Sequence, residues 1–174
     1  MLEALSSLAR TGWMLRGIPS CLAESVAEHS FWASVLAFEI AVRLRTKGRD
    51  VDPYRAAAIA LFHDIGESVI GDIARVAGIS REEKLKAERM AVQSLPLTDE
   101  AKKLQEEFDR GETDEALVAR LSESLATLIK AIVYGYKGYN VNDIKENMEK
   151  IIKEITDKLG ARDIVYDMLR DMDA

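Results

Sequence analysis

The sequence predicts an all-α protein that folds as a single-domain helical bundle. Residues that favour helix, such as Ala, Leu, Glu and Lys, are abundant, whereas glycine and proline number only 10 and 3 among 174 residues. Apolar and polar residues do not alternate over any long stretch, so no strand is expected. Several segments also begin with a residue that commonly caps helices.

The first third of the chain predicts a short helix, a loop and a long helix. Leucines spaced by three indicate a helix over about residues 2–8, and two glycines and a proline in residues 12–24 indicate a connecting loop. Ser25 is followed three residues later by Glu28, which is the spacing of a capping box. The long helix that Ser25 opens should run to about Lys47.

The next helix should lie in the core. Asp52 can cap it, and Pro53 suits the first helical position, where no backbone N–H is needed. The stretch from Ala56 to Asp64 is almost entirely apolar, which indicates burial. We expect this helix to end near Gly66.

The remaining chain predicts five more helices. Ser80 with Glu83 forms a second capping box, while Thr98 and Thr113 each precede acidic residues. Glycines separate the last segments. The expected helices after Gly66 cover about residues 81–94, a segment from 98, then 113–134, 142–158 and 162–172.

Charge and cysteine content limit the possible functions. The net charge of −6 argues against a nucleic-acid polymer or an anionic membrane as partner. No apolar run is long enough to cross a bilayer, and the N-terminus lacks the features of a signal sequence. The single cysteine, Cys21, rules out a disulfide within the chain. We therefore expect a cytoplasmic protein.

The chain has two histidines, and each has an acidic neighbour. Glu28 precedes His29, and His63 is followed by Asp64 at the end of the apolar helix. A buried aspartate is costly unless it is paired or binds a metal. Imidazole and carboxylate ligands together suit Mn, Fe, Co or Zn. Two hydrogen-bonded core histidines remain the alternative.

These residues also resemble a known family. The matching elements are Glu28-His29, His63-Asp64, Glu67 and Gly71-Asp72. This pattern is similar to that of the HD-domain phosphohydrolases, and the stretches 11–16, 24–30 and 63–73 resemble the 5′-deoxynucleotidase branch. The resemblance covers about residues 8–135, whereas the helices at about 142–172 match nothing recognised. It implies one HD domain over residues 1–174.

The resemblance implies a metal centre and a reaction. His29, His63 and Asp64 would bind one divalent ion (Co, Mn, Zn or Fe). The family has a closing aspartate on a later helix, where this chain has Glu123, and Asp114 is the competing candidate. The implied reaction releases phosphate from (deoxy)nucleoside 5′-monophosphates by attack of a metal-bound water.

Four further residues are candidates for the reaction. Glu67 could orient or deprotonate the water, or else simply begin the next helix. Asp72 could activate water or hold the sugar 3′-hydroxyl, or else cap a helical turn at residues 73–75. Arg16 could clamp the phosphate, with a surface charge as the alternative. Trp13 could stack on the base, with core packing as the alternative.

Two rival functions and the assembly state remain open. The chain could cleave another nucleotide, such as a cyclic nucleotide, a triphosphate or an alarmone. It could also be a non-catalytic nucleotide-binding regulator, because Glu123 replaces the expected aspartate. Apolar helix faces and the resemblance suggest a homo-oligomer, most simply a dimer. The charged segment with Lys84, Lys86 and Arg89 is expected to face solvent, although Lys84 could reach a phosphate.

Overall fold

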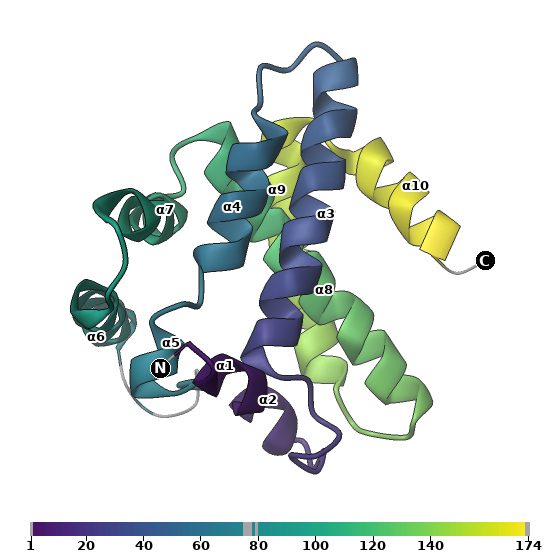
Figure 1. The fold of residues 1–174 in the computed structure, drawn as a ribbon. Helices are drawn as coiled ribbons and strands as arrows, with labels where there is room; N and C mark the ends of the chain where they lie inside the picture. The colour runs from purple at the N-terminus through teal and green to yellow at the C-terminus, as the bar shows by residue number, and fades with distance from the viewer. Residues whose placement is uncertain (1, 75–77, 79, 173–174) are drawn as a thin grey trace.

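The computed structural model describes residues 2–74, 78 and 80–172 and shows an all-α chain (Figure 1). Within these residues no strand forms, and the only strand-like feature is an isolated antiparallel bridge between Ala9 and Ser25. The predicted fold class is confirmed. The helices are α1 (Ala4–Ser7), α2 (Thr11–Met14), α3 (Val26–Thr46), α4 (Pro53–Phe62), α5 (Glu67–Ile70), α6 (Arg81–Ser94), α7 (Asp99–Arg110), α8 (Asp114–Tyr136), α9 (Asn142–Leu159) and α10 (Arg162–Met172).

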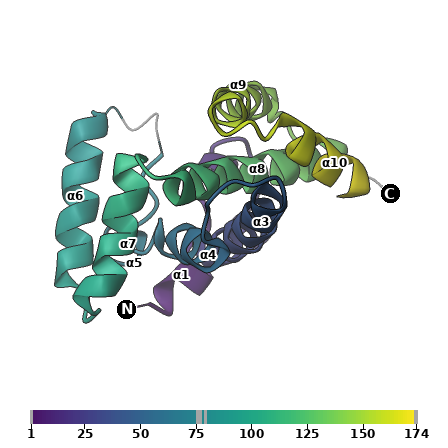
Figure 2. The same ribbon diagram turned by 90° about the horizontal axis from the view of Figure 1, so that it is seen from above.

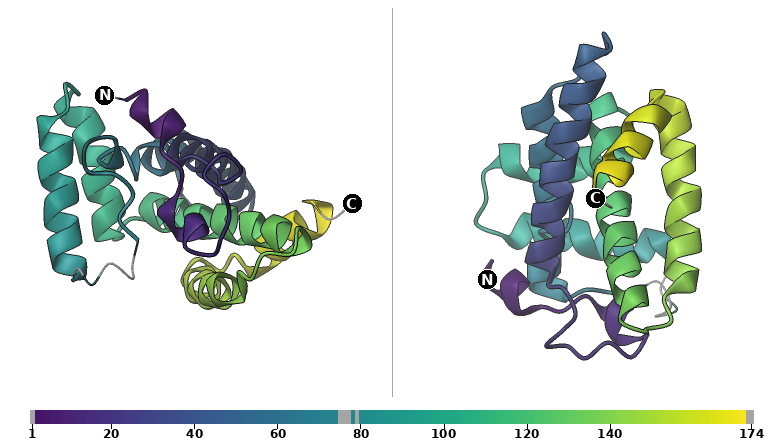
Figure 3. Two further views of the ribbon diagram at one scale, coloured as in Figure 1. Left: turned by 90° about the horizontal axis from the view of Figure 1, so that it is seen from below. Right: turned by 90° about the vertical axis from the view of Figure 1, so that its right-hand side faces the viewer.

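Three helices form the centre of the bundle. Helices α3, α4 and α8 each pack against the other two, and α9 packs on α8. Seen from above, α6 and α7 lie on one side of this centre and α10 lies on the opposite side, while α9 lies against α8 on the side away from α3 (Figure 2). From below, α1 and α2 lie near the ends of α3 and α8 (Figure 3).

The helix starts agree with the capping residues in the sequence. The Ser25 and Ser80 side chains both form complete capping boxes, with Glu28 and Glu83 respectively. Asp52 accepts hydrogen bonds from the first backbone N–H groups of α4. These side chains satisfy N–H groups that lack a partner at the start of any helix, so the start can be predicted locally.

Three boundaries differ from the prediction. The expected loop 12–24 begins with helix α2, because the Asp72 carboxylate accepts the backbone N–H of Thr11 at the start of that helix. Helix α4 ends at Phe62, and residues 63–66 form a turn before α5. Helix α8 continues past Gly135 to Tyr136.

A continuous apolar core joins the long helices and sets where the site lies. Its members come from α3, α4, α8, α9 and α10. His29 lies early in α3, His63 directly follows α4, and Glu123 lies in the middle of α8. Because these three helices pack together, residues far apart in sequence meet. Among the described residues, no helix combines the length and apolar character needed to cross a membrane.

Candidate active site

Two histidines and an aspartate meet where α3 and α4 pack together. One ligand atom from each of His29, His63 and Asp64 lies within 4.8 Å of the other two. The two imidazole centroids are 5.3 Å apart. Both histidines are buried. The fold therefore brings together the first three metal ligands that the sequence predicts.

The imidazole nitrogens of this cluster suit a metal ion. Nδ1 of His63 lies 2.7 Å from the Ala60 carbonyl oxygen, so it acts as the donor and leaves the lone pair on Nε2. Both ring nitrogens of His29 are buried without a hydrogen-bond partner, and Nε2 of His63 is buried with only the Asp64 carboxylate near it, 2.9 Å from Oδ2. Unsatisfied buried polar atoms are costly and rare. A cation bound by Nε2 of His63 and a nitrogen of His29 would satisfy them, so the donor set fits a divalent ion.

Charge at the cluster favours neutral His29 and ionised Asp64. Burial, with help from Arg10 and His63, holds the pKa of His29 well below its usual value. Burial alone would raise the pKa of Asp64, but His63 and Arg10 outweigh it and hold that pKa below its usual range. A neutral imidazole and a carboxylate are the forms that bind metal.

Glu123 lies near this cluster but is not part of the three-atom group. Its carboxylate interacts electrostatically with His63 and with Arg10. The Ser124 hydroxyl donates a hydrogen bond of 3.0 Å to Glu123 Oε2. Asp114, the competing candidate, instead forms an ion pair with Arg49 at 2.7 Å.

Glu67 begins α5 one turn after His63 and is only 4% exposed. Burial raises the pKa of Glu67 to about 10, with further increases from Asp64 and Asp72, while Arg10 and Lys84 oppose the shift. A carboxyl group that keeps its proton near neutral pH suits general acid or base chemistry. The predicted catalytic residue thus lies beside the predicted ligands.

Asp72 stabilises the start of α2. Its carboxylate accepts the Thr11 backbone N–H, and its backbone oxygen accepts the Thr11 hydroxyl at 2.8 Å. The expected helical turn at 73–75 does not form over residues 71–74, and Arg75 lies outside the described residues. Asp72 also contributes to the high pKa of Glu67, so its charge acts at the site.

Two predicted substrate-binding residues have other partners. The Arg16 guanidinium forms an ion pair with Asp143 of α9 and bonds the Gly12 carbonyl oxygen. Trp13 is 2% exposed and packs edge-on against Tyr134, with ring centroids 5.0 Å apart. The stacking role predicted for Trp13 disagrees with this burial, because neither ring face is open to a base.

Arg10 is the cation that the sequence analysis missed. Its Nη1 lies 3.9 Å from Asp64 Oδ2 and is buried without a hydrogen-bond partner. Its charge also interacts with Glu24, Glu123 and Asp72. Nothing local separates Arg10 from Arg16, because both flank α2. Arg10 rather than Arg16 faces the site because of the bridge between Ala9 and Ser25, which fixes the position of the residue next to Arg10.

Glu24 is a buried carboxylate beside His29. Its Oε1 lies 3.8 Å from His29 Nδ1 and accepts the Trp13 indole N–H at 2.9 Å. Burial raises the pKa of Glu24, although Arg10 lowers it. At 3.8 Å the contact between Glu24 and His29 is electrostatic, because His29 Nδ1 has no hydrogen-bond partner.

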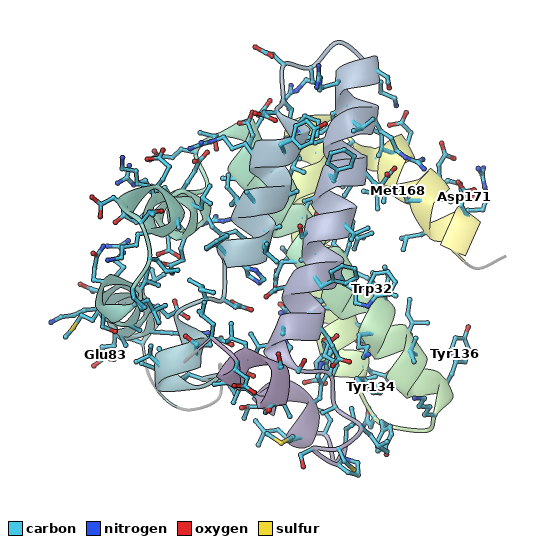
Figure 4. All side chains as sticks on the ribbon, in the orientation of Figure 1. Trp32, Glu83, Tyr134, Tyr136, Met168 and Asp171 are labelled. Atoms are coloured by element: carbon cyan, nitrogen blue, oxygen red, sulfur yellow. The ribbon has the colours of Figure 1, made fainter. Side chains whose placement is uncertain are left out.

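Tyr134 of α8, which is labelled in Figure 4, holds the backbone of Glu24 in place. Its hydroxyl accepts the Glu24 backbone N–H at 2.8 Å and donates to the Leu22 carbonyl oxygen at 2.9 Å. The Glu28 carboxylate, in contrast, accepts a hydrogen bond from the Ser25 backbone N–H.

Comparison with known proteins gives one family and clear relatives. A family model described as HD domain matches residues 2–162. A 5′-deoxynucleotidase from Dictyostelium discoideum is 29% identical over 138 residues, which cover 75% of this chain and 72% of that protein. A human 5′-deoxynucleotidase is 31% identical over 136 residues, 75% of this chain and 63% of that protein. The solved structure of a conserved hypothetical protein from Pyrococcus furiosus has a TM-score of 0.84 and 27% identity, covering 97% of this chain and 95% of that one.

Proposed function

Since this chain belongs to the HD-domain family, we propose that it is a divalent-metal-dependent phosphohydrolase that releases phosphate from (deoxy)nucleoside 5′-monophosphates. The observation that carries this proposal is the convergence of two buried imidazoles and a carboxylate within 4.8 Å. The relatives named 5′-deoxynucleotidase support the choice of a nucleoside monophosphate.

His29, His63 and Asp64 would hold one divalent ion of the Mn, Fe, Co or Zn class, and Glu123 is our candidate for a fourth ligand. When bound, such an ion supplies Lewis-acid chemistry that activates water and polarises a phosphoryl oxygen. The Glu24 carboxylate places a charge 3.8 Å from His29 Nδ1, and the Ala60 carbonyl oxygen fixes the tautomer of His63.

The chain's own charged residues would supply the other two things that the reaction needs, which are proton transfer and binding of the substrate. Glu67 would hold and move a proton at its carboxylate, and Asp72 would bind the sugar hydroxyl or help activate water. Arg10 is our candidate for binding the phosphate in place of Arg16, because its buried Nη1 lacks a partner beside Asp64. An arginine fork suits phosphate oxygens.

The decisive experiment measures phosphate release from ribo- and deoxyribonucleoside 5′-monophosphates. Chelator-stripped protein should be given one metal at a time, with a cyclic nucleotide, a triphosphate and an alarmone as further substrates. We expect His63→Ala and Asp64→Ala to lose metal and turnover while keeping their helical circular dichroism. Turnover by either variant would refute the site, and turnover confined to another nucleotide class would replace the substrate.

We also propose that residues 1–174 act as one HD domain in the cytoplasm, consistent with the exposed, unpaired Cys21. We further propose a homodimer. Helices α3 and α4 share an exposed apolar face that includes Phe31 at 60% exposure and Tyr54 at 75%, with Trp32 of α3 beside Phe31 (Figure 4). A two-fold dimer buries the same face of both copies, so one apolar face would suffice for both sides of the interface. Phe31→Asp should shift the sedimentation coefficient from dimer to monomer, and an unchanged value would reject this face.

A further inference from the structure

Lys84 lies near the start of α6 and reaches across to α5. Its ammonium nitrogen lies 3.9 Å from Glu67 Oε1 and 3.3 Å from Glu88 Oε1. Its side chain is 32% exposed, so it lies against the protein rather than in the solvated row predicted from the sequence. Lys86, two residues further along α6, is exposed as predicted.

The position of Lys84 on its helix is electrostatically poor. The first turn of α6 already contains Glu82 and Glu83, whose charges complement the partial positive charge at a helix N-terminus. A lysine one residue later is disfavoured by that same dipole. Its pair with Glu88 runs in the weaker direction, with the cation N-terminal to the acid. Helix energetics therefore favour a lysine here only weakly, and the Glu67 carboxylate opposite is its second acidic partner.

Close packing holds α6 against the residue that precedes Glu67. A Cβ added to Gly66 would lie 3.1 Å from the Glu88 carbonyl oxygen and 3.2 Å from a methyl group of Val92. A real side chain at this position would be crowded, so the close approach of α6 to this backbone requires glycine at position 66. The close approach of the two backbones thus limits the distance between Lys84 and Glu67.

Little else fixes the Glu67 carboxylate. Helix α5 has only four residues, and no side chain caps it. Among the described part of the chain, Lys84 is the only cation within 4.0 Å of that carboxylate. A proton-transferring group must point at its target, and a misplacement of about 1 Å can cost about 100-fold in rate.

We propose that Lys84 is a positioning residue, which orients the Glu67 carboxylate from α6 while Glu88 holds the ammonium group in place. This inference rests on the proposed function, because it concerns the turnover that Glu67 would support. Lys84 need not touch the substrate. Its loss should therefore lower kcat and leave substrate binding almost unchanged.

The test compares Lys84→Met with Lys84→Arg, and uses Lys86→Met as the matched control on the same helix. All four full-length proteins, including wild type, are loaded with the metal that supports wild-type turnover, and metal content is measured. With deoxyadenosine 5′-monophosphate as probe, Lys84→Met should lower kcat by about 10- to 100-fold, with KM changed less than about twofold. Lys84→Arg should recover most of kcat, and Lys86→Met should match wild type. Lys84→Gln replaces the methionine variant if that variant does not fold.

A crystal structure of Lys84→Met gives a readout that does not depend on turnover, and it should show the Glu67 carboxylate displaced. A large rise in KM at constant kcat would overturn the inference, because Lys84 would then bind the phosphate. An unchanged kcat would also overturn it. Wild type without activity on any monophosphate would refute the proposed function instead, and an undisplaced Glu67 in the variant crystal would then decide against this inference.

Discussion

Replacing Glu67 by glutamine should stabilise the metal-free protein, and more so as the pH rises. In the folded chain, burial and the charges of Asp64 and Asp72 raise the pKa of Glu67 to about 10, whereas its ordinary value is 4.5. The folded state therefore binds a proton that the unfolded chain releases above that ordinary value. Stability contributed by Glu67 is fully present below pH 4.5 and is lost as pH rises towards the folded pKa. Glutamine has nearly the same shape and does not titrate.

The magnitude follows from the interval between the ordinary pKa and the pH of the assay. At pH 7 this interval is about 2.5 pH units, and each unit is worth about 1.36 kcal/mol. Glu67→Gln should thus raise the free energy of unfolding by up to about 3 kcal/mol at pH 7, and by almost nothing at pH 4.5. The carboxyl is almost fully buried, so solvent screening reduces this figure little.

Urea unfolding of both proteins in chelator, followed by circular dichroism from pH 4.5 to 8, measures this difference. Glu154→Gln, at an exposed position of α9, is the control and should show no pH-dependent gain. A difference between Glu67→Gln and wild type that stays constant over the whole range would refute the reasoning, since Glu67 would then not hold its proton on folding.

Three further predictions concern the supports of the site. Gly71 has φ 78° and ψ 166°, a conformation nearly confined to glycine, so Gly71→Ala should cost about 1–3 kcal/mol in unfolding free energy. Gly12 lies in helical α2, and a Cβ added there would meet nothing within 4 Å. Gly12→Ala should therefore raise the free energy of unfolding by about 0.5 kcal/mol. Equal effects of the two substitutions would contradict the backbone argument. Tyr134→Phe loses two buried hydrogen bonds and should cost about 1–3 kcal/mol by urea unfolding, with an unchanged midpoint as the opposing result. Adding the activating metal at 100 times its Kd should add about 2.7 kcal/mol to wild type by calorimetry and nothing to Asp64→Ala; a similar gain in both would place the metal elsewhere.

Local signals allowed much of the fold to be predicted. Ser25 with Glu28, and Ser80 with Glu83, satisfy their own helix starts, so neighbouring residues contain the whole explanation. The short helix α2 was missed because its support, Asp72, lies 61 residues away. A contact at that separation leaves no trace in local periodicity.

The residues of the candidate site also divide into those that the sequence predicted and those that it did not. His29, His63 and Asp64 were identified because the pattern around them resembles that of the HD-domain phosphohydrolases, and the packing of α3 on α4 then brings them together. Arg10 and Glu24 were missed, since an arginine or glutamate near a loop is common. Their roles depend on which backbone lies opposite, which only the folded chain determines.

The hydroxyl of Tyr134 has a consequence for how the site opens. The segment between the two partners of the Ala9–Ser25 bridge is closed by the backbone bonds from Arg10 to Glu24 and from Val26 to Leu8, and Tyr134 fastens it to α8. If that fastening is released, Glu24 leaves both Trp13 and His29 in one event. Amide protons of Arg10, Glu24 and Val26 should accordingly exchange with deuterated solvent at one shared rate, and that rate reports how often the site opens.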